Sequence, residues 1–109
     1  MEAMRLREVC DALGVSRRAI QGYEKAGLIS PSGKNERGYL LYNKKAQDRI
    51  KEIKLFQQIG FTLKEIGNII DAPGEIQKMA LEERLARMKE EKRNIETLIY
   101  EVNRLIEKR

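Results

Sequence analysis

The last 35 residues of the chain constrain its fold most, because they contain neither glycine nor proline. Apolar side chains recur in them at alternating steps of four and three residues, which is the heptad pattern of a coiled coil. The eight positions of this seam are Leu81, Leu85, Met88, Lys92, Ile95, Ile99, Val102 and Ile106. The pattern predicts one helix about 50 Å long at roughly 1.5 Å per residue. A single helix leaves such a stripe unburied, so we expect it to pair with a second copy of the chain as a homodimer.

Charge is distributed unevenly along the chain. Overall, 22 Lys and Arg residues stand against 17 Asp and Glu residues, a net charge of +5. Residues 75–109 are nearly neutral, with nine basic and eight acidic side chains, so the excess positive charge lies in residues 1–74. A polyanion such as nucleic acid should therefore bind there. Within the seam, Lys92 is the one charged position, and its ammonium group needs solvent or an acidic partner.

Residues 6–27 predict two short helices joined by a tight turn. The first helix ends at Gly14 and carries its apolar side chains on one face. These are Leu6, Val9, Cys10 and Leu13. Ser16 is a good N-cap for the second helix, which ends near Gly27, and two helices about a glycine turn form a helix-turn-helix candidate. We assign Cys10 to the core, since a small buried thiol is commoner than a redox or metal switch.

Residues 30–43 predict a small β-hairpin, which we call the wing. Turn-forming proline and glycine residues precede a strand-like run over residues 39–42. Apolar residues then return to helical spacing over 44–58, and Gly60 closes this third helix.

Thr62 and Glu65 form a capping box, in which each side chain satisfies a backbone N–H of the other residue, so a fourth helix begins there. It stops at residues 71–74. The predicted fold class is thus all-α with a small β-hairpin wing. We expect a winged helix-turn-helix domain over residues 1–74 and a dimerisation coiled-coil helix over residues 75–109.

Composition argues against an enzyme. The chain has no His, one Cys and no Trp, so the commonest general base and metal ligand are missing. It also lacks a glycine-rich phosphate loop and any pattern of paired carboxylates on a rigid pocket. The start, MEAMRLREVC, has no apolar run long enough for a signal peptide or a membrane span. We expect a cytoplasmic protein without cofactor, metal or membrane partner.

Several segments together resemble the MerR family of bacterial transcription regulators. They are VSRRAIQGYEKAGLISP, RGYLLY, DRIKEIKLFQQIGFTLKEIGNII and the terminal heptads. The resemblance implies a dimer joined by a long antiparallel helix, whose two winged modules bind a palindromic promoter in double-stranded DNA. It also implies that the dimer bends and untwists an overlong promoter spacer, so that RNA polymerase engages both promoter elements.

The chain departs from the family pattern at three positions. Gln21 and Gly22 stand where the family usually has an arginine and an aromatic residue, and Leu40 follows Tyr39 where an arginine is usual. We expect Arg37 to compensate for Leu40. The chain also ends before the segment in which relatives carry inducer-binding groups, so no small-molecule site is expected. It is either a regulator without its own sensor or the N-terminal module of a larger one.

The second helix supplies the candidate base contacts. Arg17 and Arg18 lie at its start, where recognition-helix side chains meet base edges, and arginine suits bidentate contact to guanine. Gln21, one turn later, suits adenine or a phosphate, and Lys25 suits a phosphate. Tyr23 is expected in the core with its hydroxyl offered to a phosphate. The alternative for the arginines is a pair of solvated surface charges.

The wing and the helices after it supply candidate phosphate contacts. We expect Tyr39 to lie against the sugar-phosphate backbone and Tyr42 to turn inward. The cations that cluster around the hairpin are Lys34, Arg37, Lys44 and Lys45. Lys64 stands at a helix N-terminus that also attracts phosphate, although the capping box suffices without DNA. The alternative for these cations is a surface patch that only keeps the protein soluble.

Two other functions are consistent with the pattern. One is a protein-interaction adaptor in which the amphipathic helix binds a partner coiled coil and the winged module is a scaffold. The other is a simple repressor or architectural DNA-binding protein that leaves the promoter spacer undistorted. Salt separates the first from a DNA-binding role, because phosphate contacts weaken steeply with salt and apolar association changes little.

Overall fold

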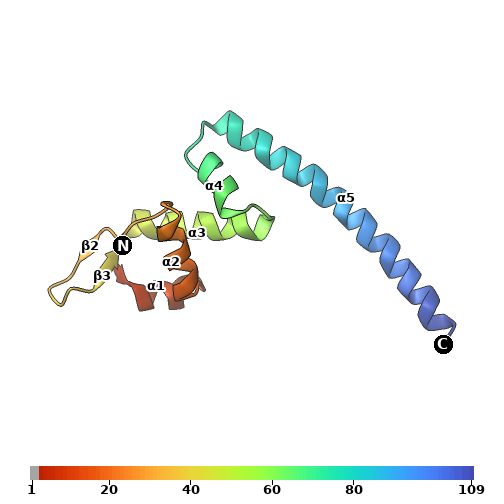
Figure 1. Cartoon of the computed structure of the whole chain (residues 1–109), viewed down its shortest axis with the longest axis horizontal. Helices are drawn as coiled ribbons and strands as arrows, with labels where there is room; N and C mark the ends of the chain where they lie inside the picture. Colours follow the sequence, from red (N-terminus) through yellow and green to blue (C-terminus); the bar gives the residue numbers. More distant parts are fainter. Residues whose placement is uncertain (1–2) are drawn as a thin grey trace. The chain divides into compact units, whose positions relative to one another are not determined.

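The computed structural model describes residues 3–109, so the first two residues of the segment searched for a signal peptide lie outside it. Its elements in chain order are β1 (Met4–Arg5), α1 (Leu6–Leu13), α2 (Arg17–Lys25), β2 (Gly33–Lys34), β3 (Leu40–Tyr42), α3 (Lys44–Ile59), α4 (Leu63–Ile69) and α5 (Gly74–Glu107) (Figure 1). They form two compact units, one extending to Asp71 and the other running from Ala72 to Arg109. The predicted fold class, helical with a small wing, is confirmed.

The turn between α1 and α2 is fixed by local chemistry. Gly14 ends α1 with a φ of 63°, a left-handed conformation that glycine adopts without steric cost. The Lys54 Nζ of α3 donates to the carbonyl oxygens of Leu13 (3.1 Å) and Gly14 (3.0 Å), which are carbonyls that the helix end leaves unpaired. Ser16 begins α2, and its Oγ accepts a hydrogen bond from the Ala19 N–H at 2.9 Å. The predicted helix-turn-helix and its cap are confirmed.

The wing belongs to a three-stranded antiparallel sheet in the order β1-β3-β2. The predicted hairpin is present, with Lys34 opposite Leu40, and Figure 1 shows it projecting from the helices of this unit. The sequence did not predict β1, in which Met4 pairs with Tyr42. Two residues are too few to show a periodic pattern. This strand is therefore defined only by its pairing with β3.

The wing tip is held by one asparagine. Asn35 Oδ1 accepts hydrogen bonds from the backbone N–H groups of Arg37 and Tyr39, both at 3.0 Å. Gly38 lies between them with a φ of 80°. These hydrogen bonds within the chain therefore fix the backbone conformation of the wing tip.

Side-chain caps position the next two helices. Asn43 Oδ1 accepts from the Ala46 N–H at 2.9 Å and so starts α3, which Gly60 closes. At α4 the predicted capping box is present. Thr62 Oγ1 accepts from the Glu65 N–H at 3.1 Å, and Glu65 Oε1 accepts from the Thr62 N–H at 2.9 Å.

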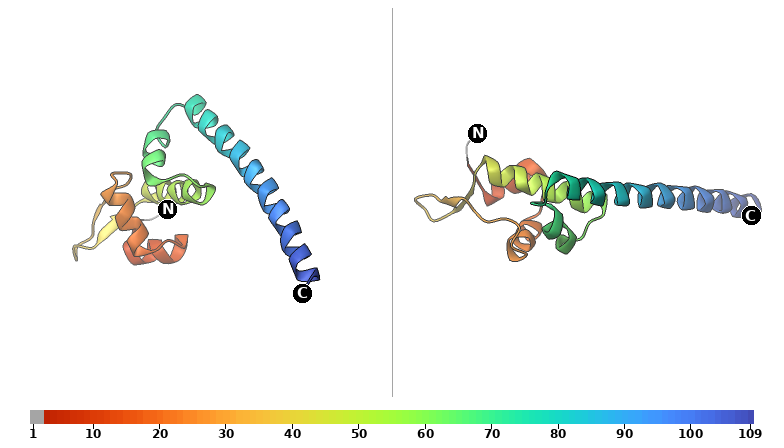
Figure 2. Two further views of the ribbon diagram at one scale, coloured as in Figure 1. Left: turned by 45° about the vertical axis from the view of Figure 1, so that its right-hand side comes forward. Right: turned by 90° about the horizontal axis from the view of Figure 1, so that it is seen from above.

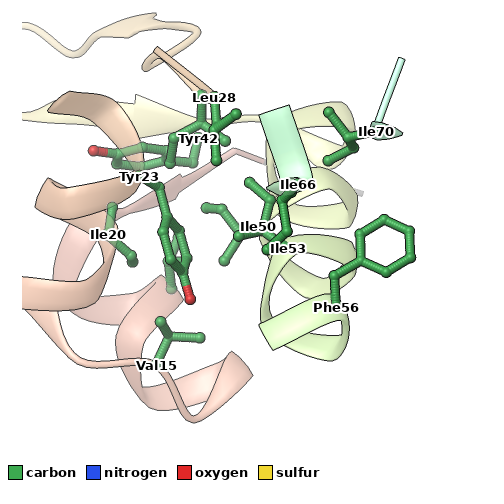
Figure 3. Packing of buried hydrophobic residues seen from close by; sticks show 12 residues of the cluster. Val15, Ile20, Tyr23, Leu28, Tyr42, Ile50, Ile53, Phe56, Ile66 and Ile70 are labelled. Carbon is green, nitrogen blue, oxygen red and sulfur yellow. The ribbon is translucent and has the colours of Figure 1, made fainter. Parts of the chain in front are cut away.

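The core of the N-terminal unit joins α1, α2, β3, α3 and α4, and Figure 3 shows its central side chains. Six of them have no exposed surface: Val9, Ile20, Tyr42, Ile50, Ile53 and Ile66. Burying an isoleucine of this kind contributes about 1.5–3 kcal/mol. Cys10 is half-buried and packs against this cluster, as do Leu6 and Leu13, so the apolar face predicted for α1 is confirmed.

The C-terminal unit consists of one unbroken helix, α5, which Figure 2 shows from two further directions. It begins at Gly74, one residue before the predicted start. Within the described residues, no side chain of α5 is buried. The apolar seam residues range from 37% exposed at Leu81 to 64% exposed at Ile106. No helix in the described part of the chain is long and apolar enough to cross a membrane.

Candidate nucleic-acid interface

Helix α2 has a buried face and a polar, cationic one. Ile20 and Tyr23 point into the core, while the other predicted contact residues of this helix are exposed. These are Arg17, Arg18, Gln21 and Lys25. Because the Ser16 cap fixes where the helix starts, both arginines lie in its first turn, which contains no acidic residue. The first turn of α2 therefore concentrates positive charge, and the positive end of the helix dipole adds to it.

Tyr23 lies in the core and Tyr42 turns inward, as predicted, and this burial corrects their inclusion among the candidate DNA contacts. Tyr42 is fully buried and Tyr23 is 2% exposed. Their hydroxyls donate within the chain, Tyr23 to Gln57 Oε1 at 2.7 Å and Tyr42 to Glu24 Oε1 at 2.9 Å. Burial raises the pKa of both phenols, and for Tyr42 the hydrogen bond to the Glu24 carboxylate raises the pKa further. Both hydroxyls therefore join α2 to a neighbouring element, Tyr23 to α3 and Tyr42 to β3.

The wing exposes its predicted residues. Lys34 and Arg37 are exposed, and Tyr39 is 48% exposed. The Arg5 guanidinium lies over the Tyr39 ring, 5.7 Å from its centroid, in a cation–π contact. Leu40, the departure from the family pattern, is partly buried and packs against the core. Its side chain anchors the wing, which is why an apolar residue suits this position.

A cluster that sequence reasoning missed lies beside the wing. Three arginines from three elements line one hollow together with residues of the wing tip. Its lining is Arg5 of β1, Arg7 of α1, Arg17 of α2, and Leu6, Gly38, Tyr39 and Leu40. We call Arg5, Arg7 and Arg17 the arginine cluster. The basic residues Arg5 and Arg7 are evident in the sequence. Their closeness to Arg17, however, depends on the pairing of β1 with β3.

The predicted cations at the helix starts are exposed but separate from the arginine cluster. Lys44 and Lys45 lie in the first turn of α3, and Lys44 Nζ is 2.8 Å from Asp48 Oδ1. That hydrogen bond holds the pKa of the Asp48 carboxyl below its usual range and partly neutralises Lys44. Lys64 is exposed in the first turn of α4. The hollow that the arginine cluster lines does not include these lysines.

Two further cations are structural. The Arg49 Nε donates to the Leu28 carbonyl at 2.7 Å, and its guanidinium makes two hydrogen bonds to the Asp71 carboxylate, one of them 2.9 Å long. The guanidinium lowers the pKa of Asp71. Lys54 caps α1, as described above. These two positive charges therefore hold elements together, and the charge offered to a polyanion comes from the other cations of this unit.

A helix-turn-helix with a strand-edged wing and a cationic second helix defines the winged class of nucleic-acid-binding proteins. Residues 4–73 match the family model described as MerR HTH family regulatory protein. The chain therefore belongs to the MerR family of helix-turn-helix regulatory proteins, and the resemblance stated above is confirmed.

Known relatives agree with this assignment. The chain is 30% identical over 101 residues to the transcriptional activator mta of Bacillus subtilis, covering 93% of this chain and 39% of the activator. It is 39% identical over 66 residues to a mercuric resistance operon regulatory protein of Bacillus cereus, covering 61% of this chain and 50% of the relative. The crystal structure of the N-terminus of the B. subtilis multidrug transporter activator superposes with a TM-score of 0.76 at 29% identity, covering 94% of this chain and 97% of that one. The chain thus spans half or less of these two curated relatives.

Proposed function

We propose that this chain is a sequence-specific, DNA-binding transcription regulator of the MerR type that acts as a homodimer in the cytoplasm and catalyses no reaction. The observation that carries the proposal is the exposed pair Arg17 and Arg18 at the capped start of α2. Arginine in the first turn of a recognition helix is suited to the major-groove edge of guanine. Relatives named as transcription regulators support a regulatory role over a catalytic one.

In this proposal α2 lies in the major groove and the wing follows the adjacent backbone. Arg17 and Arg18 read base edges, and Gln21 contacts a base or a phosphate farther along the helix. Arg5 and Arg7 contact phosphates beside the groove, because they line the same hollow as Arg17 and the wing tip. The remaining exposed cations add phosphate contacts: Lys25, Lys34, Arg37, Lys44, Lys45 and Lys64. Tyr39, which is half-exposed under Arg5, lies against the sugar-phosphate backbone.

The long helix supplies the second half of the mechanism. We assign residues 1–74 to the DNA-binding module and residues 75–109 to dimerisation. The exposed seam of α5 leaves apolar surface that a second copy would bury. Two modules related by a dyad then bind a palindromic site. By analogy with the family, the dimer distorts the promoter spacer and so controls RNA polymerase.

The test begins with selection of bound duplexes from a random pool, because the operator is unknown. We expect a palindrome whose half-sites are related by the dyad of the dimer. Recovery of no enriched sequence, together with equal affinity for all duplexes, would contradict sequence-specific regulation.

Footprinting on the selected site then separates the two DNA-binding roles. Enhanced reactivity at the centre of the site indicates the distorted spacer expected of a MerR-type activator. A uniformly protected, undistorted centre indicates a simple repressor or architectural protein instead.

A further inference from the structure

The positions of the charged side chains on α5 restrict how two copies of the helix can pair. The family resemblance already implies antiparallel pairing; we propose that two α5 helices pair in one register, with the dyad between Arg93 and Asn94, and that Lys89, Lys92 and Glu96 select this register. The proposal rests on the homodimer of the proposed function. It goes further by naming the residues that meet across the interface and the charges that disfavour other pairings.

On the outer face of α5, some of the charged side chains form ion pairs within the same chain. Ion pairs join Glu83 to Arg87 at 3.2 Å and Glu101 to Arg104 at 3.7 Å, both away from the seam. On one edge of the seam, Arg84 pairs with Glu91 at 2.8 Å. These pairs satisfy charge without help from a second chain.

The other edge of the seam carries Lys89 and Glu96, and the seam itself contains Lys92. All three side chains are exposed. Within residues 3–109, none of the three belongs to an ion pair. Near the middle of the helix they are therefore the charges that a second copy could satisfy, whereas Glu82, one heptad before Lys89 on the same edge, lies opposite the partner's uncharged Asn103 in this register.

Helix geometry allows one antiparallel register in which every seam residue faces another. In antiparallel coiled coils each layer joins one seam position of one helix to the alternate seam position of the other. Four kinds of layer then use all eight positions. They are Leu81 with the partner's Ile106, Leu85 with the partner's Val102, Met88 with the partner's Ile99, and Lys92 with the partner's Ile95.

Sliding by one heptad gives worse layers. In one direction Val102 meets the partner's Lys78 and Ile106 meets the partner's Gly74. In the other direction Leu85 meets the partner's Arg109, and Leu81 extends beyond the partner's end. Each slide exchanges apolar contacts for contacts with charge, glycine or solvent.

The edge charges select the same register. There Lys89 lies opposite the partner's Glu96, and the dyad repeats this attractive pair. The partner's Glu96 also lies within one residue of Lys92 along the axis, about 1.5 Å of helix rise, so the lysine stem packs in the seam while its ammonium group reaches that carboxylate. A slide of one heptad instead places Lys89 against itself or Glu96 against itself, both repulsive.

The same charges disfavour a parallel pair. Aligned in parallel, Lys92 faces the partner's Lys92 inside the seam. At the edges, Arg84 faces the partner's Lys89 and Glu91 faces the partner's Glu96. All three contacts join like charges, and the first would be partly desolvated.

Cysteine exchange tests the register in the full chain. Leu85→Cys and Val102→Cys are made separately in a Cys10→Ser background, and sedimentation first establishes that each variant is dimeric. Under mild oxidation we expect neither variant alone to crosslink, since the two Leu85 positions lie about 25 Å apart along the axis at 1.5 Å per residue. After subunit exchange, the mixture should yield a crosslinked heterodimer.

The outcomes separate the two proposals. Crosslinking by Leu85→Cys alone would indicate a parallel pair and overturn the register, as would a dimeric mixture that fails to crosslink. Monomers of the unmodified chain at micromolar concentration would overturn the homodimer of the proposed function itself.

A charge-reversal cycle tests the selecting residues. Lys89→Glu and Glu96→Lys should each raise the dimer Kd about tenfold at low salt, because each replaces two attractive pairs with two repulsive ones. The double variant should return the Kd to within about threefold of the unmodified chain. Glu90→Lys makes the same charge change on the outer face and should shift the Kd by less than about twofold. Tighter dimerisation by Glu96→Lys would overturn the proposal, since that is what relief of the parallel Glu91–Glu96 repulsion predicts.

Discussion

Arg17 combines two properties that a base-reading side chain needs. It is exposed, and the Ser16 cap and the buried Ile20 hold the helix on which it stands. It also lines the hollow shared with Arg5 and Arg7, so neighbouring phosphates have their own cations. Arg17 is thereby available for a base edge rather than needed for the backbone.

At the residue scale we therefore predict that Arg17→Ala relaxes sequence preference. Loss of a bidentate guanine contact should weaken binding to the selected site by about 1–3 kcal/mol and change affinity for a scrambled duplex much less. Lys34→Ala, at the exposed wing, is the matched control and should weaken both duplexes equally. Fluorescence titration measures both affinities. Equal losses on both duplexes for Arg17→Ala would assign this arginine to the backbone.

Single residues also show where sequence reasoning fails. Arg17, Arg18 and their exposure follow from helical periodicity, which is a local property. The inward turn of Tyr42 is predictable from the sequence, but the bond from its hydroxyl to Glu24 is not, because it joins two elements far apart in the chain. Such a pairing leaves no local pattern.

At the scale of elements, caps made the helices predictable. Ser16, Thr62 and Gly60 mark helix ends through side-chain and backbone chemistry that acts over three or four residues. Strand β1 has no such signal, because two residues become a strand only when β3 lies beside them. The arginine cluster depends on β1, so it could not be predicted either.

The link from Arg49 to Asp71 and Leu28 gives an element-scale prediction. Arg49 lowers the pKa of Asp71, so the link stabilises the fold above the ordinary carboxyl pKa and is lost as pH falls through the lowered value. Asp71→Asn should therefore reduce the free energy of unfolding at pH 7. The difference from the unmodified chain should disappear in acid, where Asp71 is protonated in both states.

Urea unfolding over a pH series from pH 7 down through the titration of Asp71 measures this, with Asp11→Asn, an exposed change on α1, as the control. A difference that persists unchanged in acid would mean that the Asp71 charge contributes nothing.

At the scale of the whole molecule, net positive charge and the exposed apolar seam are segregated. Residues 1–74 hold 13 basic and nine acidic side chains, whereas the exposed apolar seam lies on α5. The two surfaces suit two kinds of partner, a polyanion and another apolar helix. This segregation was predictable from the sequence because it needs only counting and heptad spacing.

The segregation predicts opposite responses to salt. Between 50 and 200 mM salt, the affinity of the dimer for its operator should fall on the order of a thousandfold, as expected for roughly six or more phosphate contacts. The dimer Kd, measured by sedimentation over the same range, should change far less because apolar burial is insensitive to screening. A DNA affinity that hardly varies with salt would favour the adaptor function.

Under the proposed function, the exposed apolar seam of α5 also links promoter occupancy to the number of chains present. Within the described residues this helix buries no side chain in its own chain, and in the proposed dimer the second copy covers its apolar seam. Below the dimer Kd, the number of complete regulators therefore grows with the square of the number of chains. While the promoter is far from saturated, a twofold rise in synthesis would then give about a fourfold rise in promoter occupancy, a steeper response that arises from surface that one polypeptide leaves uncovered.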